Sequence, residues 1–150
     1  MESKRRTRLL HILLRPTFGA LLFVSQFTAS RSGFAADNRV LFILGLAVVV
    51  TGAVVFTWAT LSLIKAADAK RVAEAGPFRF IRHPIYTSMY VICTGMGLIF
   101  FAWLWFIVMV AFIPLWYLEA KEEEKQMTRL YGKSYTDYQT KTGMFLPKIR

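Results

Sequence analysis

Two long stretches of apolar residues without a single charge constrain what this chain can fold into. The first covers residues 40–64 and the second residues 86–118. As a helix, the 25 residues of the first stretch would extend about 37 Å, which exceeds the ~30 Å hydrocarbon core of a bilayer and fits a tilted span. The pattern predicts an all-α protein, a polytopic bundle of membrane helices.

The composition supports this class. Of the 150 residues, 55% are hydrophobic and 19% are charged, whereas soluble domains carry about 25% charged residues. A net charge of +10 is typical of nucleic-acid-binding proteins, but the basic residues here flank the apolar stretches, as in membrane proteins. The single cysteine, Cys93, lies inside an apolar stretch and cannot form an intrachain disulfide.

About four spans are expected in one domain of residues 1–150, followed by a cytoplasmic tail. The second apolar stretch is too long for one comfortable span and too short for two full ones, which predicts a helical hairpin that turns near residues 101–103. The basic N-terminus before the first span also fits a cleaved signal peptide, although the apolar part is long for one. The expected spans are residues 9–29, 40–64, 86–100 and 103–118, and the tail is residues 119–150.

The basic residues predict the topology. Seventeen of the 19 lysines and arginines lie before the first span or near its start, between the second and third spans, or after residue 118. Only Arg31 and Arg39 fall in the remaining loop. By the positive-inside rule both termini are expected to be cytoplasmic, which requires an even number of crossings.

A polar segment, residues 76–86, lies between the two apolar stretches. Residues 65–75 before it read as a helix that leaves the membrane and ends at Gly76-Pro77. The segment itself contains two arginines and one of the two histidines of the chain. Such a segment could hold a charged ligand at the edge of a bundle, or its arginines could be ordinary interfacial anchors.

The tail begins with a cluster of glutamates and high helix propensity as far as Gly132. The cluster fits a solvated helix start, but Glu123 shares a helical stripe with Met127 and Leu130, and Glu119 lies one turn earlier. A carboxylate on that side needs a partner, either Arg82, His83 or a cationic ligand. The remainder, residues 135–147, reads as an amphipathic segment that folds back against the bundle. The histidines and Cys93 make a poor zinc site, so no metal is expected.

Together these motifs resemble the isoprenylcysteine carboxyl methyltransferase family of integral membrane enzymes. The resemblance covers residues 72–147 and includes Gly-Pro-Phe-Arg at 76–79, Arg-His-Pro-Ile-Tyr at 82–86, Glu-Glu at 123–124, Tyr-Gly at 131–132, the two tyrosines Tyr135 and Tyr138, and Leu-Pro at 146–147. Met127 and Tyr131 replace a leucine and a phenylalanine of the family pattern. The wider fold group also includes phospholipid N-methyltransferases and sterol reductases.

The resemblance implies an S-adenosylmethionine site at the cytoplasmic face, closed by the C-terminal helical segment. The implied cofactor-binding residues are Arg82, His83, Tyr86, Glu119, Glu123, Glu124 and Tyr135, with Arg82 and Glu123 in catalytic roles. A lipophilic acceptor would enter laterally from the bilayer. A carboxylate or thiolate acceptor is mildly favoured because no unambiguous general base is visible. An amine of a phospholipid, a lipid reductase and a non-catalytic membrane subunit stay open as alternatives.

Overall fold

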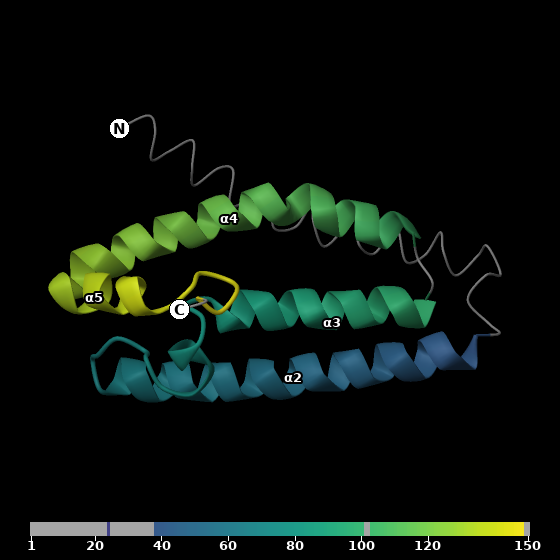
Figure 1. The fold of residues 1–150 in the computed structure, drawn as a ribbon, viewed down its shortest axis with the longest axis horizontal. Helices are drawn as coiled ribbons and strands as arrows, with labels where there is room; N and C mark the ends of the chain where they lie inside the picture. The colour runs from purple at the N-terminus through teal and green to yellow at the C-terminus, as the bar shows by residue number, and fades with distance from the viewer. Residues whose placement is uncertain (1–23, 25–37, 101–102, 149–150) are drawn as a thin grey trace.

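The computed structural model describes residues 24, 38–100 and 103–148, and within these ranges the chain is helical (Figure 1). The predicted all-α membrane bundle is confirmed, since the described residues contain only one isolated bridge, between Ile81 and Gly143, and no strand. The expected first span and the basic N-terminus lie outside the described residues. The elements are α2 (Arg39–Asp68), the 3-10 helix η1 (Gly76–Arg79), α3 (Pro84–Phe100), α4 (Trp103–Tyr131) and α5 (Lys133–Lys141).

Helices α2, α3 and α4 lie lengthwise beside one another, and α3 runs antiparallel to its two neighbours (Figure 1). The buried residues of α2 are all small and recur every seventh position, as in a coiled-coil seam: Gly45, Gly52, Ala59 and Ala66. A Cβ atom added at Gly45 would lie 2.8 Å from the carbonyl oxygen of Gly95, so the two backbones approach closely. Gly97, by contrast, packs against Trp105 and Phe106 of α4.

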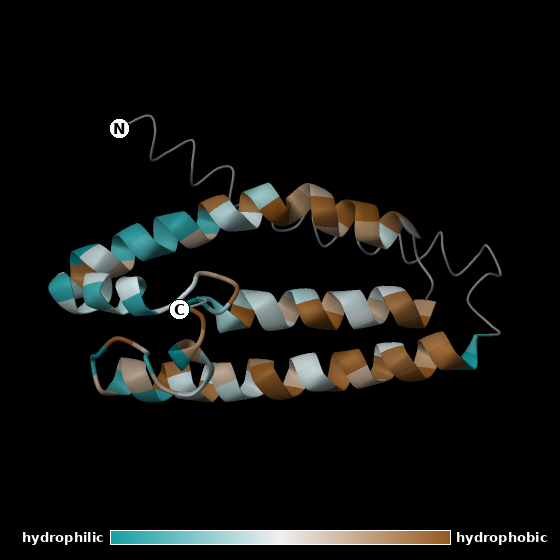
Figure 2. Ribbon diagram, in the orientation of Figure 1, coloured by the Kyte–Doolittle hydropathy of each residue, from teal (hydrophilic) through white to brown (hydrophobic). Residues whose placement is uncertain are grey.

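Much of the surface is apolar. Figure 2 shows hydrophobic residues along α2, α3 and the first half of α4, with hydrophilic residues collected at one end of the bundle. Side chains such as Val40 and Ile43 are 65% and 64% exposed, which is favourable facing lipid and costly facing water. Among the described residues, two helices, α2 and α4, are long and apolar enough to cross a membrane, while α3 is apolar but shorter.

Two helix ends differ from the sequence-based expectation. Helix α2 ends at Asp68 rather than near residue 75, because Lys70 adopts a positive φ of 50° and the amide of Arg71 donates to the carbonyl of Ala66, the geometry of a Schellman cap. Helix α4 continues past residue 118, through the glutamate cluster, because nothing breaks it before Gly132. The second arm of the hairpin and the helix of the tail are therefore one helix.

The difference in helix length creates the site. Helix α3 has 17 residues, against 30 in α2 and 29 in α4. Its neighbours extend beyond its N-terminus, and the space between them holds the connection 69–83, α5 and the C-terminal segment 142–148 (Figure 1). Two backbone hydrogen bonds join this segment to the connection, from the amide of Arg82 to Gly143 O (2.8 Å) and from that of His83 to Met144 O (3.0 Å).

Candidate active site

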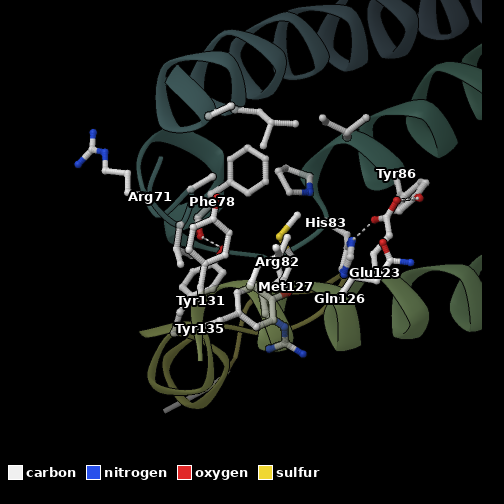
Figure 3. Close-up of a pocket in the computed structure, with 18 residues that line it drawn as sticks. Arg71, Phe78, Arg82, His83, Tyr86, Glu123, Gln126, Met127, Tyr131 and Tyr135 are labelled. Carbon is white, nitrogen blue, oxygen red and sulfur yellow. Dashed lines mark hydrogen bonds and ion pairs between the residues drawn. The ribbon is translucent and has the colours of Figure 1, made fainter. Parts of the chain in front are cut away.

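A cavity of about 440 Å³ lies at the hydrophilic end of the bundle, between the end of α2, the connection and the second half of α4 (Figure 3). This volume falls within the ~300–1,000 Å³ typical of small-molecule sites. Residues 76–86 form one wall and the predicted stripe of α4 forms the opposite wall. The lining residues that Figure 3 labels are Arg71, Phe78, Arg82, His83, Tyr86, Glu123, Gln126, Met127, Tyr131 and Tyr135.

A polar cluster centred on Glu123 occupies one side of the cavity. The hydroxyl of Tyr86 donates a hydrogen bond to Glu123 Oε1 at 2.7 Å, and His83 Nδ1 lies 3.7 Å from Glu123 Oε2. The Glu123 side chain is 45% exposed, so its carboxylate is held in place without being buried. It keeps lone pairs for a ligand, because each carboxylate oxygen accepts two hydrogen bonds.

A second polar cluster is built around Arg82 and Glu124, beside the wall that residues 76–86 form. Arg82 Nε donates to Glu124 Oε1 at 2.6 Å, and Arg82 Nη1 donates to the carbonyl oxygens of Gln139 (3.2 Å) and Thr142. The Gln139 amide donates to Glu124 Oε2 at 3.1 Å. The two charged side chains are only 11% and 6% exposed. This network holds α5 and the C-terminal segment against the connection.

The charge state of Glu124 follows from this network, which lies beyond the apolar part of α4. Burial alone would raise its pKa, but neighbouring His83 and the Arg82 guanidinium outweigh burial and lower the pKa from 4.5 to about 2. Glu124 is therefore ionised at neutral pH. His83 lies between both glutamates, with Nε2 at 3.4 Å from Glu124 Oε1, and this buried nitrogen makes no well-aligned hydrogen bond within the described residues.

Aromatic rings line the rest of the cavity. Tyr135 and Tyr138 of α5 are buried, and the hydroxyl of Tyr138 donates to the carbonyl of Phe78 at 2.7 Å, which fixes η1 against α5. Burial raises the pKa of Tyr135 to about 12, so its phenol stays neutral. Neutral tyrosine rings can stack on a planar heterocycle or face a cation.

A smaller cavity of about 220 Å³ lies on the other side of Tyr86. Tyr86 lines both cavities, and its ring makes an edge contact with Trp116 at 5.1 Å between centroids. The smaller cavity is almost wholly apolar and is shared by α3, α4 and the C-terminal segment. Its lining residues are Tyr86, Thr87, Tyr90, Ile113, Trp116, Phe145 and Leu146.

The seven predicted site residues do not all line the larger cavity. Five of them line the larger cavity, namely Arg82, His83, Tyr86, Glu123 and Tyr135. Glu119 and Glu124 are not among its lining residues; Glu124 instead binds Arg82. The guanidinium of Arg82 is engaged by Glu124 and backbone carbonyls, and its catalytic role stays a prediction.

Sequence reasoning missed several lining residues. Gln126 follows Glu123 by three positions, so the stripe rule that selected Met127 would have found it. Arg71 was not foreseen because a helix was expected there, and the cap at Lys70 turns the chain back toward the cavity. Among the described residues, no three His, Cys, Asp or Glu side chains group as a metal site.

Comparison with known families decides the class. The model of the phospholipid methyltransferase family matches residues 14–134. The chain belongs to this family. The family is related to the isoprenylcysteine carboxyl methyltransferases, so the resemblance found in the sequence is confirmed. Comparisons with curated proteins and with solved structures gave no match.

Membership of the phospholipid methyltransferase family makes the chain a membrane methyltransferase by class, in agreement with the two membrane-length helices found among the described residues. The matched residues include both walls of the larger cavity. They end at residue 134, before nearly all of α5 and the C-terminal segment that binds Arg82. The part of the chain that closes the cavity therefore lies outside the matched region.

Proposed function

We propose that this protein transfers a methyl group from S-adenosylmethionine to a membrane-associated acceptor, in the cavity lined by His83, Tyr86 and Glu123. The observation that carries the proposal is the partly exposed Glu123 carboxylate, oriented by Tyr86 at the edge of an aromatic-lined cavity. An anion in this place suits a ligand that combines a cationic group with a planar ring.

The residues present fit S-adenosylmethionine, which when bound supplies an electrophilic methyl group on a sulfonium. Glu123 would hold the α-ammonium or a ribose hydroxyl, and the amide of Gln126 and the imidazole of His83 are available near the carboxylate end. The rings of Tyr131 and Tyr135 would cover the adenine. The protein then contributes alignment and exclusion of water. Arg82 and Glu124 support the site by holding α5 in place.

The acceptor is proposed to be lipophilic, with its reactive group at Tyr86. The apolar cavity shares the lining residue Tyr86 with the cavity proposed for the cofactor, so an apolar chain bound there would place its head group beside Tyr86. A carboxylate head is the first candidate, because it is already ionised at neutral pH and needs no general base.

The phospholipid methyltransferase match favours a second candidate, a lipid amine. An amine has to lose a proton, and the Glu123 carboxylate and the His83 imidazole are the groups that line the cavity and can accept one. The two candidates differ in their product, since a methyl ester is cleaved by mild alkali and an N-methyl group is not. Membranes incubated with methyl-labelled S-adenosylmethionine and then treated with alkali separate them.

Cofactor binding tests the proposal directly. We expect the detergent-purified protein to bind S-adenosylhomocysteine in calorimetry and not NADPH. Glu123→Gln should weaken this binding roughly tenfold or more, because a hydrogen bond to a charged group contributes about 1.5–3 kcal/mol. His83→Ala should weaken it as well.

The matched control is Glu122→Gln, because Glu122 pairs with Lys125 at 3.2 Å and does not line the cavity. It should leave binding unchanged. Folded protein that releases no heat with S-adenosylhomocysteine would contradict the methyltransferase mechanism, and heat with NADPH alone would favour a reductase. Normal binding by both site variants would overturn the assignment of the site and leave the class intact.

A further inference from the structure

A third cavity, of about 680 Å³, lies at the same end of the bundle, between the last turns of α2, residues 71–76 and the start of α5. It shares Arg71 and Val72 with the 440 Å³ cavity of the candidate active site. Nothing in the proposed methyl transfer uses it. Its lining residues are Trp58, Ser62, Lys65, Ala66, Arg71, Val72, Glu74, Ala75, Gly76 and Ser134.

Hydrogen-bond donors predominate in this lining. The cations of Lys65 and Arg71 line the cavity together with a single carboxylate, that of Glu74. The hydroxyls of Ser62 and Ser134 and the indole N–H of Trp58 add further donors. In the part of the chain that the structure describes, neither cation pairs with a carboxylate: the ion pairs there join Arg82, His83 and Lys125 to Glu122, Glu123 and Glu124. The cavity therefore carries unpaired positive charge.

Close packing of the backbone brings the donors together. A Cβ atom added at Gly76 would lie 2.5 Å from Ser62 Oγ and 2.9 Å from Trp58 Nε1, so both groups face the turn at Gly76. Trp58, Ser62 and Lys65 follow one another at i, i+4 and i+7, on one side of α2. One face of α2 and the turn at Gly76 therefore supply part of the donor set, and Arg71 and Ser134 of α5 complete it.

The position of the cavity indicates the source of its ligand. Lys65 directly follows the apolar stretch that ends at Ile64, so it lies where a membrane-crossing α2 meets the aqueous phase. Tryptophan and basic side chains are enriched at that level, where lipid phosphates lie. Lysine and arginine with hydroxyl donors are the usual partners of a phosphate oxyanion.

We infer that this cavity binds the phosphate of an anionic lipid headgroup, held by Lys65, Arg71 and the hydroxyls of Ser62 and Ser134. The site adjoins the cofactor cavity, with which it shares Arg71 and Val72, and it does not depend on the methyl acceptor. A lipid bound there would fix the junction of α2, the connection and α5. Because Arg71 lines both cavities, a lipid bound at this site would also contact a residue that lines the candidate active site.

The test measures binding of short-chain phosphatidic acid to the full-length protein in detergent by native mass spectrometry. Inorganic phosphate and a short-chain diacylglycerol are measured in parallel. We expect phosphatidic acid to bind and diacylglycerol not to bind. Lys65→Gln should lower the affinity roughly tenfold, because a charge-assisted hydrogen bond is lost. The control Lys125→Gln, on α4 and outside this cavity, should leave it unchanged.

Ser134→Glu provides an independent variant, since it places a carboxylate in the cavity from α5 and should also weaken binding. The Lys65→Gln variant should still bind S-adenosylhomocysteine, because Lys65 lines the third cavity and not the cavity of the candidate active site. Binding of inorganic phosphate without phosphatidic acid would assign the site to free phosphate. Equal affinity for phosphatidic acid and diacylglycerol, or no effect of either variant, would overturn the inference.

Discussion

Arg82 Nε donates a 2.6 Å hydrogen bond to Glu124 Oε1, which joins residues 42 positions apart in the chain. Removing one partner of a buried ion pair leaves an uncompensated charge and costs about 3–5 kcal/mol. We expect Arg82→Ala to lower the thermal unfolding temperature markedly and to abolish binding of S-adenosylhomocysteine, because α5 loses its attachment. Exposed Arg79 supplies the control, and Arg79→Ala should change neither. Unaltered unfolding of Arg82→Ala would show that the network does not stabilise the fold.

The low pKa of Glu124 makes stability depend on pH. Its folded pKa of about 2 lies below the ordinary value of 4.5. A group of this kind contributes stability that is fully present above pH 4.5 and is lost as the pH falls toward 2. We expect the difference in unfolding temperature between wild type and Glu124→Gln to be large at pH 7 and to shrink between pH 4.5 and 2. A difference that stays constant over this range would contradict the assignment of the charge.

Two glycines with positive φ should respond differently to alanine. Gly132 has a φ of 56° and open space around it, whereas Gly76 has a φ of 61° and lies against Ser62 and Trp58. The ψ of Gly132 is −126°, outside the left-handed helical region, and such sparsely populated backbone conformations cost a non-glycine residue about 1–3 kcal/mol. We expect Gly132→Ala to lose about that amount of stability, and Gly76→Ala to lose more and to weaken cofactor binding. Thermal unfolding and calorimetry of the two variants measure this, and equal losses would argue against close packing at Gly76.

Tyr86→Phe isolates the hydrogen bond to Glu123. The ring contacts with His83 and Trp116 remain, so stability should fall by roughly 1 kcal/mol or less. Affinity for S-adenosylhomocysteine should fall roughly fivefold, because Glu123 is no longer oriented.

Tyr90→Phe is the matched control. In the wild type, the hydroxyl of Tyr90 donates to the carbonyl of Met109 at 3.2 Å. Tyr90 lines the smaller apolar cavity and not the cofactor cavity. It should retain cofactor affinity. An equal loss of affinity in both variants would mean that Tyr86 acts through packing alone.

Much of the fold was predictable because the relevant signals are local. The uncharged stretches led to α2 and α4, and helical periodicity placed Glu123 and Met127 on one face, where both line the larger cavity. The end of α2 was not predictable. It depends on a capping geometry at Lys70, and a lysine with positive φ has no clear sequence signal.

Glu123 and Glu124 show most clearly where sequence and tertiary structure divide. The sequence determined that two adjacent carboxylates follow a membrane-length apolar helix, and that Arg82 and His83 are available as partners for them. Successive helical positions point about 100° apart, so the two glutamates point in different directions, and one lines the cavity while the other does not. Which one does was decided by the tertiary structure, since Glu124 is turned toward Arg82 by the docking of α5 and the C-terminal segment. The groups that hold this ion pair come from residues 139–142: the Gln139 amide donates to Glu124, and the carbonyls of Gln139 and Thr142 accept from Arg82. No local pattern encodes their position.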